Sequence, residues 1–340
     1  MRILSIAWFA QQRRGETLAR RLGAEFVKLP CPRTALLSRL GHYRRLSRET
    51  TAILEQRRPE VTIVQNPPIH AVAAVAAYAR RTGTSFIVDS HSGPFLDAGL
   101  LATWHRRRFA RLGRQALVTL IHNRGLIPYA DRLGLQYLVL DDPVPEDPTT
   151  EAAQLQHPAV AVVCGYGRDE PLPELLRAIR LVPEAHFYLT GRAPPGLRQP
   201  ENATATGFLA ELDYWRLLNG SDCVVTLTTR EATILGGGYD GLSAGKALVL
   251  SATQTLAGLF PKGAVLVENR AESIAEGVRS ALRRAEGLAL KGRALREEKA
   301  REWERQFRAL TDVIAQGELA HPGDTPKGTP LTGETMSDER

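Results

Sequence analysis

Short apolar runs rich in β-branched residues recur along the chain, and most are followed by a stretch with helical periodicity. Such runs are typical of strands that are buried on both faces of a parallel sheet. In the first part of the chain they occupy residues 2–9, 24–29, 61–65, 86–89, 116–121 and 137–140. In the second part they occupy residues 159–164, 186–190, 203–208, 223–228, 247–251 and 264–267. Strands that alternate with helices predict an α/β protein with doubly wound parallel sheets.

A proline-rich, acidic segment from Asp141 to Pro158 divides the chain and has the composition of a linker. We therefore expect two Rossmann-like domains, residues 1–145 and 159–316. At 340 residues the chain is long enough for each of them to bury its own core. Residues 317–340 are rich in proline and glycine and almost lack large apolar side chains, so we expect a disordered tail there.

The charge is distributed unevenly along the chain. Residues 1–140 contain 22 lysines and arginines against 8 acids, whereas residues 141–340 contain 22 against 29. A basic half predicts that the first domain meets an anionic partner, which is a membrane surface, a phosphorylated acceptor or a nucleic acid. On the helix predicted over 36–57, the basic residues Arg39, Arg44, Arg45 and Arg48 alternate with Leu37, Leu40, Tyr43 and Leu46. This pattern suits a helix on an anionic membrane, and it equally suits a solvated helix.

The three cysteines, Cys31, Cys164 and Cys223, form no CxxC pair, so neither a disulfide framework nor a cysteine-ligated metal is expected. The apolar start of the chain is too short for the core of a signal peptide, and residues 70–79 are too short to span a bilayer. No histidine spacing suggests a metal site, and there is no Asp-x-Asp triplet. We expect a cytoplasmic protein, able to lie peripherally at the inner face of the cell membrane, with no metal or cofactor of its own.

A glycine turn lies between the fourth and fifth apolar runs of the second part. Gly236, Gly237 and Gly238 come just before a stretch that can start a helix. Free N–H groups and the positive end of a helix dipole meet there, which makes a site for a phosphate. Glu231 and Asp240 bracket the turn and suit hydrogen bonds from hydroxyl groups better than contact with an anion. Phosphate donors beside hydroxyl acceptors indicate a nucleotide sugar, although a glycine-rich surface loop with two solvated acids explains the same residues.

Polar residues also follow the predicted strands of the first domain. They are Gln65, Asn66, Asp89, His91 and Asn123. Because ligands of doubly wound sheets gather at the carboxyl ends of the strands, these side chains are further candidates for a site.

Several short motifs of the second half, in this order, resemble the nucleotide-binding domain of GT-B fold glycosyltransferases, in particular glycosyltransferase family 4 (group 1). They are Leu189-Thr-Gly191, Thr206-Gly-Phe-Leu209, Leu217-Leu with Ser221-Asp-Cys-Val-Val225, and the segment from Glu231 to Ser251. In the first half the resemblance is carried by the strand–helix order and by Asp89-Ser-His91. The resemblance implies a GT-B fold, with two Rossmann-like domains facing a cleft. It also implies transfer of a hexose from a nucleotide sugar to a glycan or lipid-linked acceptor, in polysaccharide or glycolipid biosynthesis.

The resemblance further implies a role for each residue that matches the family's motifs. His91, Glu231 and Asp240 would be catalytic, with His91 facing the transferred sugar, Glu231 its hydroxyls and Asp240 the ribose. The donor-binding residues would be Arg168, Gly191, Gly207, Phe208, Gly236, Gly237, Gly238 and Tyr239, and the N–H groups of the last three would hold the diphosphate. Retention of the anomeric configuration is expected on the same ground, and metal-independent transfer from the missing Asp-x-Asp triplet.

The sequence departs from the family's pattern in two places. Eight residues instead of the usual seven separate Glu231 from Asp240, and the second acid is Asp in place of Glu. A lysine usually follows the arginine at position 168 by about five residues, but Asp169-Glu-Pro-Leu-Pro173 occupies that segment. Arg192 or Lys246 would have to complete a two-cation clamp on the phosphates.

Other interpretations stay open. A sugar-nucleotide epimerase of the same architecture would need catalytic acids in both domains. A non-catalytic glycosyltransferase-like binding protein would explain the missing lysine. A nucleic-acid-binding module suits the basic half, although no recognised binding motif accompanies the charge. Among single residues, His91 can be a packing residue, Arg168 a surface partner of Asp169 or Glu170, and Asp240 an ordinary acid of a first helical turn.

Overall fold

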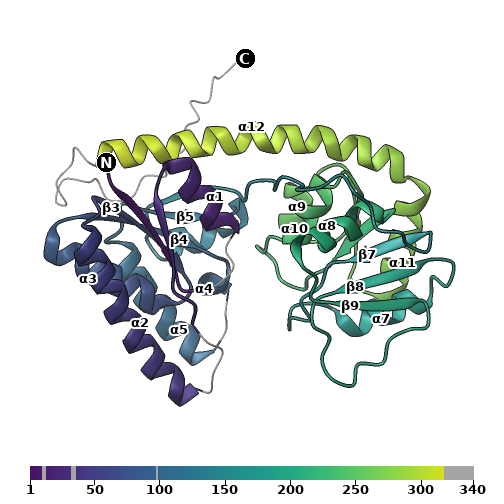
Figure 1. Cartoon of the computed structure of the whole chain (residues 1–340), viewed down its shortest axis with the longest axis horizontal. Coiled ribbons are helices and arrows are strands. Elements are labelled where there is room, and N and C mark those ends of the chain that lie inside the picture. Colours follow the sequence, from purple (N-terminus) through teal and green to yellow (C-terminus); the bar gives the residue numbers. More distant parts are fainter. Residues whose placement is uncertain (10–12, 32–35, 97–98, 318–340) are drawn as a thin grey trace. The chain divides into compact units, whose positions relative to one another are not determined.

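The computed structural model describes residues 1–9, 13–31, 36–96 and 99–317 and divides the chain into two compact units (Figure 1). Unit 1 contains residues 1–143 and 303–317, and unit 2 contains residues 144–302. The first domain was predicted to end at residue 145, two residues after the observed end of this part of unit 1 at residue 143. The predicted second domain, 159–316, needs correction at both ends, because the proline-rich segment belongs to unit 2 and the last helix returns to unit 1. Of the predicted tail, residues 318–340 lie outside the described residues.

Unit 1 is built on a six-stranded parallel sheet with the strand order β2-β1-β3-β4-β5-β6. Its strands are β1 (Ile3–Ala7), β2 (Glu25–Lys28), β3 (Val61–Asn66), β4 (Ser85–Ser90), β5 (Val118–Ile121) and β6 (Tyr137–Val139). Its helices are α1 (Arg13–Leu22), α2 (Leu36–Arg57), α3 (Ile69–Thr82), α4 (Gly93–Leu96), α5 (Leu100–Gly113), the 3₁₀ helix η1 (Arg124–Leu126) and α6 (Ile127–Arg132). The carboxyl-terminal part of α12 (Ala285–Gly317) completes the unit.

Helices cover both faces of this sheet. On one face, α1 and the end of α12 pack on strand residues such as Ile63 and Leu120. In the part of α12 that belongs to unit 1, the buried apolar residues include Trp303, Phe307, Leu310 and Ile314. Their spacing of three or four residues places them on one side of the helix, which explains why this segment joins a core distant in sequence. On the other face, α3 packs against both α2 and α5.

Unit 2 is built on a second six-stranded parallel sheet, with the order β12-β11-β10-β7-β8-β9. Its strands are β7 (Ala159–Val162), β8 (His186–Thr190), β9 (Ala203–Gly207), β10 (Cys223–Thr226), β11 (Ala247–Ser251) and β12 (Ala264–Val267). Its helices are α7 (Leu172–Arg180), α8 (Glu211–Gly220), α9 (Gly236–Ser243), α10 (Gln254–Leu259), α11 (Ala271–Arg283) and the first part of α12. All the predicted strands of both units are present, with ends that differ by two residues at most.

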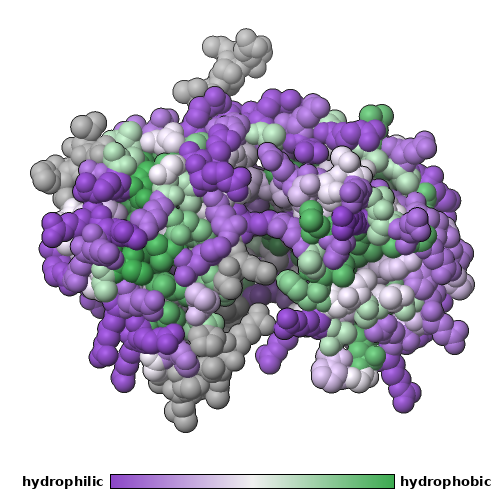
Figure 2. Space-filling model, viewed as in Figure 1, coloured by the Kyte–Doolittle hydropathy of each residue, from purple (hydrophilic) through white to green (hydrophobic). Residues whose placement is uncertain are grey.

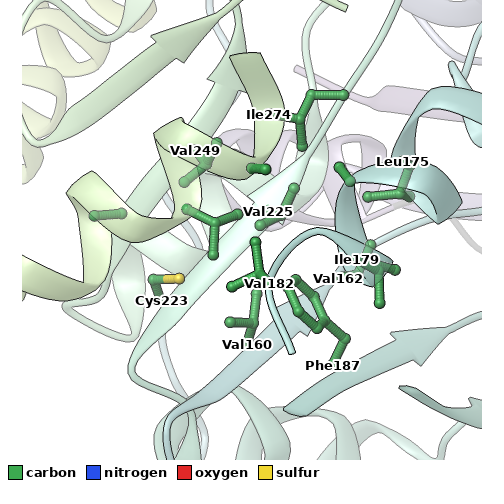
Figure 3. Packing of buried hydrophobic residues seen from close by; sticks show 14 of the residues in the cluster. Val160, Val162, Leu175, Ile179, Val182, Phe187, Cys223, Val225, Val249 and Ile274 are labelled. Carbon is green, nitrogen blue, oxygen red and sulfur yellow. The ribbon is translucent and has the colours of Figure 1, made fainter. Parts of the chain in front are cut away.

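The strands of unit 2 send alternate residues to opposite faces, as strand geometry requires. From β10, Cys223 and Val225 pack in a core with residues of α7 and α11 (Figure 3). The residue between them, Val224, packs on the other face with Leu218 of α8 and Leu242 of α9. A strand that is apolar at every position is therefore a central strand covered on both sides, as its sequence predicted.

The helix with the predicted basic face, α2, covers the predicted residues 36–57. Its apolar residues Leu46 and Leu54 are buried in unit 1, whereas Arg44, Arg45 and Arg48 are exposed. The side chains of Leu37, Arg39 and Leu40 lie outside the described ones. Hydrophilic residues cover most of the face shown in Figure 2, with smaller hydrophobic areas between them. Within the described ranges, no helix is long and apolar enough to cross a membrane.

Candidate functional site

The strand order of unit 2 reverses between the neighbouring strands β7 and β10. Ligands of open α/β sheets bind beside such a switch point, at the carboxyl ends of the strands. The loops that leave this edge follow β7, β8, β9 and β10. Most of the predicted donor-binding residues lie at the strand ends, in these loops or at the start of α9: Arg168, Gly191, Gly207, Phe208 and the glycines that open α9. The structure therefore brings these residues to one edge of unit 2.

The loops after β7 and β10 are hydrogen-bonded to each other. The Asp169 carboxylate accepts a hydrogen bond from the Thr228 hydroxyl at 3.2 Å. The Asp169 carbonyl oxygen accepts one from the Thr229 N–H at 2.6 Å. These contacts fix the loop that carries Arg168 beside the loop that carries Glu231.

Glu170 folds back onto its own loop. Its two carboxylate oxygens accept hydrogen bonds from the N–H groups of Gly165, at 2.8 Å, and Tyr166, at 2.9 Å. Arg168 between them is exposed, and among the described residues no ion pair joins it to Asp169 or Glu170. The interpretation of Arg168 as the surface partner of these acids is therefore wrong.

The helix α9 begins at Gly236, three residues earlier than Tyr239, where the sequence suggested a start. A Cβ atom at Gly237 would lie 2.6 Å from Val163, and one at Gly238 would lie 3.0 Å from Phe260. Both glycines are thus required for close packing of the helix on the sheet. At Gly236, which is exposed, nothing lies within 4 Å of a Cβ atom.

This start of the helix corrects which N–H groups can face an anion. Gly238 donates its N–H to the Leu235 carbonyl oxygen at 3.0 Å. Tyr239 comes later, where an α-helix uses N–H groups internally. Its side chain is buried against Phe260, with ring centroids 5.4 Å apart. The N–H groups of Gly236 and Gly237, in place of the predicted set of three, are the ones placed to meet a phosphate.

The two predicted acids of unit 2 differ in their surroundings. Asp240 is only 7% exposed, and one of its carboxylate oxygens accepts a hydrogen bond from the Tyr214 hydroxyl at 2.7 Å. It therefore holds α9 against α8, which goes beyond the role of an ordinary first-turn acid. Glu231 is exposed, and its carboxylate accepts an N–H from Gln254 at 3.2 Å, at the start of α10. Its exposed carboxylate can reach a hydroxyl group of a ligand.

Of the two cations considered for the phosphate clamp, only Arg192 lies at this edge. It follows β8, and its guanidinium lies 5.7 Å from the ring of Phe208, which is 62% exposed after β9. Lys246 instead precedes β11, at the opposite edge, and its ammonium donates to the Asn219 carbonyl oxygen at 2.7 Å. The suggestion that Lys246 completes the clamp is therefore wrong.

Two further glycines of the predicted set have backbone reasons for their identity. Gly191 has φ +84°, and a Cβ atom there would lie 2.3 Å from the Cys164 carbonyl oxygen. Gly207 ends β9 with φ +72° and has open space around it. Gly191 lets the ends of β7 and β8 approach, so its identity is a requirement of the sheet.

In unit 1, a buried arginine connects the carboxyl end of β4 with the segment that follows β6. Arg14, 7% exposed, donates from Nε to the Asp89 carboxylate at 3.0 Å and from Nη1 to the Asp142 carboxylate at 2.7 Å. Nη1 also contacts the Asp141 carbonyl oxygen at 2.9 Å. Burial alone would lower the pKa of Arg14, but the two carboxylates outweigh it and raise this pKa above its usual value.

His91 stands beside this ion pair at the end of β4. One of its ring nitrogens lies 2.7 Å from the Gln65 amide, and its ring meets the ring of His122 edge-on at 4.4 Å. Burial lowers the pKa of His91, and burial together with the neighbouring His91 and Arg14 lowers the pKa of His122 well below its usual value. Both rings are therefore neutral near pH 7 and suited to hydrogen bonds with hydroxyl groups.

The predicted gathering of polar residues at this edge is confirmed for the strand ends. The Asn66 amide donates to the Ser90 hydroxyl at 3.3 Å, and Asn123 is buried at the end of β5. Sequence reasoning missed Arg14 and His122, because arginine in a helix and a single histidine after a strand carry no motif. Within the described ranges, no three His, Cys, Asp or Glu side chains gather as a metal site requires.

Comparisons with known proteins concern a domain within unit 1 and the fold of the chain. Residues 4–120 match the glycosyl transferase 4-like domain family, which covers about a third of the chain. No curated protein matches the sequence.

Solved structures with similar folds cover nearly the whole chain. HepE of Anabaena, crystallised with UDP, has a TM-score of 0.70 at 11% identity over 93% of this chain and 100% of its own. Sucrose-phosphate synthase of Thermosynechococcus elongatus has a TM-score of 0.73 at 12% identity, over 93% of this chain and 99% of its own. UDP-GlcNAc 2-epimerase of Methanocaldococcus jannaschii has a TM-score of 0.58 at 13% identity, over 92% of this chain and 100% of its own. The protein thus has the GT-B fold with two Rossmann-like units, carries a glycosyl transferase 4-like domain over residues 4–120, and resembles glycosyltransferase family 4.

Proposed function

We propose that the protein transfers a sugar, such as a hexose, from a nucleotide-sugar donor to a glycan or a lipid-linked acceptor. The observation that carries this proposal is the start of α9 at the switch point of unit 2. Gly236 is exposed there, with open space around its Cα. An anion can approach the N–H groups of Gly236 and Gly237 and the positive end of the helix dipole.

The surroundings of this helix end suit the other parts of a nucleotide sugar. The exposed Arg168 supplies a cation for the diphosphate. The exposed ring of Phe208, with the guanidinium of Arg192 beside it, offers an aromatic surface for a base. HepE, which has the same fold, was crystallised with UDP and with UDP-glucose, so a uridine donor is the first to test.

In the proposed reaction, the anomeric carbon of the donor sugar bonds to a hydroxyl oxygen of the acceptor while its bond to the phosphate oxygen breaks. The proton of the acceptor hydroxyl passes to the departing phosphate oxygen, and the nucleoside diphosphate leaves with the electron pair of the broken bond. The N–H end of α9 and Arg168 can stabilise the charge that develops on this leaving group. Glu231 and the neutral His91 suit hydrogen bonds with sugar hydroxyls. We propose retention of the anomeric configuration and no metal requirement, from the resemblance to family 4 and the lack of an Asp-x-Asp triplet.

The basic balance of residues 1–140 supports an acceptor that is anionic or borne by an anionic membrane. This would place the reaction at the inner face of the cell membrane, in polysaccharide or glycolipid synthesis. The protein would act there as a cytoplasmic, peripheral enzyme.

Epimerisation of a sugar nucleotide is less well supported, although the 2-epimerase shares the fold. It would require acids of unit 1 to exchange protons with the substrate. Asp89 is buried and ion-paired with Arg14, so it is poorly placed to take or give a proton. Transfer needs no such acid.

Thermal unfolding with a panel of nucleoside diphosphates and their sugar conjugates tests the donor site. A ligand at a hundred times its Kd stabilises the folded state by about 2.7 kcal/mol. Arg168→Gln and Gly236→Val should reduce the stabilisation by the matching nucleotide. Arg293→Gln is the control, because Arg293 is exposed beside Gly292, which contacts Gly263 at the opposite edge of the sheet.

Release of nucleoside diphosphate in the presence of acceptors then tests transfer, with and without a chelator of divalent metals. We expect equal turnover in both. Turnover that is lost in chelator and restored by magnesium would contradict the metal-independent mechanism. Stabilisation by a nucleotide sugar without release in any acceptor mixture would favour the non-catalytic binding protein, and no stabilisation by any nucleotide would exclude the donor site.

A further inference from the structure

The outer side of α5 carries a stripe of exposed side chains that unit 1 leaves uncovered. Leu101 is 65% exposed and Trp104 is 48% exposed, one helical turn apart. Arg107 and Arg111 continue the same side of the helix and are exposed, and Arg108 is half-buried with its guanidinium 5.2 Å from the Trp104 ring. These five residues are called the α5 face below. Their spacing of three to four residues makes one continuous strip.

The charge of this strip is of one sign. Residues 99–130 contain six arginines and no Asp or Glu. Neighbouring elements add to it, since Arg80 at the end of α3 reaches Gln115 just beyond α5. The α5 face is therefore apolar at its beginning and strongly basic over the rest of its length.

We propose that the α5 face docks on an anionic lipid bilayer. Trp is favoured where membrane meets water, since its ring is apolar and its N–H polar. Leu101 beside it can enter the acyl boundary, while the arginines attract anionic headgroups. A nucleic acid would use the same arginines, but it gives no reason for an exposed leucine beside the tryptophan.

The contrasting helix is α2, on which the sequence placed a basic membrane face. Its buried Leu46 and Leu54 belong to the core, and its exposed side combines Arg44, Arg45 and Arg48 with the acids Glu49 and Glu55. Because no large exposed apolar residue accompanies these arginines in the described part of α2, this helix provides a matched control with the same number of charges.

The topology gives the α5 face a place relative to His91. The helix α5 follows β4, whose carboxyl end leads directly to His91, and it runs back toward the start of β5. Leu101 and Trp104, in its first turns, therefore lie toward the same edge of the sheet as His91. A membrane held by these residues would present a lipid-linked acceptor at that edge, so the inference deepens the proposed function; vesicle binding itself needs no sugar transfer.

Sedimentation of the full chain with vesicles of phosphatidylcholine, alone or mixed with phosphatidylglycerol, tests the proposal. We expect stronger partition onto the mixed vesicles that weakens as salt rises. The variant Arg107→Gln/Arg108→Gln/Arg111→Gln should lose about 100-fold in partition, which corresponds to about 1 kcal/mol for each arginine. The control Arg44→Gln/Arg45→Gln/Arg48→Gln should lose far less. Equal losses in the two triple variants would overturn the proposal.

Tryptophan fluorescence gives an independent readout, because the other tryptophans, Trp8, Trp215 and Trp303, are buried. Mixed vesicles should shift the emission of the wild type to shorter wavelength, and Leu101→Ser/Trp104→Ser should abolish the shift and weaken partition. A wild-type spectrum that stays unchanged would exclude the bilayer as the occupant. The same conclusion would follow if duplex RNA displaced the protein from vesicles at a lower concentration than added anionic vesicles do. Stabilisation by UDP, measured on the same variants, should stay at the wild-type level, so failure of the donor site and failure of the α5 face are distinguishable.

Discussion

Replacing Arg14 by methionine should destabilise unit 1 by about 3–5 kcal/mol, the usual cost of removing one partner from a buried ion pair. Arg14 serves two carboxylates and a carbonyl oxygen, at 3.0, 2.7 and 2.9 Å. Without Arg14, the Asp89 carboxylate lacks this partner and is almost out of contact with water, since the residue is buried. Asp142 is 28% exposed and can be hydrated, so most of the cost belongs to Asp89.

The double variant Arg14→Met/Asp89→Leu should recover most of the lost stability, because two apolar side chains replace two paired charges of similar volume.

Amide hydrogen exchange measures this effect with an internal reference. Protection of the β4 amides should fall by roughly a hundredfold to several thousandfold in Arg14→Met, which corresponds to 3–5 kcal/mol. Protection of β10, in unit 2, should stay at its wild-type level. A loss of less than tenfold in β4, or a double variant as damaged as the sum of the single ones, would refute the role assigned to the ion pair.

Further predictions concern both units. Unit 1 should lose stability as pH falls below about 6.5, because His122 resists protonation in the folded state and takes a proton only when unfolded. The free energy of unfolding should fall by up to about 1.4 kcal/mol per pH unit, and His122→Leu should reduce this dependence in denaturant titrations. Gly237→Val should lower the unfolding temperature of unit 2 because its side chain meets Val163, whereas Gly236→Val should leave that temperature unchanged and weaken nucleotide binding. Glu231→Ala should abolish sugar transfer with unchanged far-UV circular dichroism, and wild-type turnover by this variant would contradict its assignment.

The sheets and most helices could be predicted because their signals are local. A run that is apolar at every position has one favourable place, a strand covered on both faces. The short helix α10 was missed, since its six residues contain too few apolar positions to show a period. The helix α12 continues through Gly292, which packs against Gly263, where a Cβ atom would lie 2.8 Å from the Cα of Gly292. This glycine inside a helix thus allows close packing and does not break the helix.

The return of α12 to unit 1 could not be predicted. The stripe of Trp303, Phe307, Leu310 and Ile314 shows that one side of the helix is buried, but either core satisfies that pattern. Asp240 gives a similar lesson within unit 2. Its partner Tyr214 lies 26 residues earlier, on another helix, so the sequence showed an acid after a glycine turn and nothing of the hydroxyl that holds it. Local patterns identify a polar residue, and only the fold identifies its partner.

The segment after Arg168 shows how a departure from a family pattern can be structured. Where the family has a lysine, this chain has acids, and a missing cation suggested a weakened phosphate site. In the structure Glu170 instead binds the N–H groups of Gly165 and Tyr166, and Asp169 binds the loop of Thr228. These N–H groups are therefore already satisfied by a carboxylate and are not left for a ligand. We therefore expect Arg168 and the first turn of α9 to bind the diphosphate. A substitution at Gly236 tests this site more directly than one at Asp169 or Glu170.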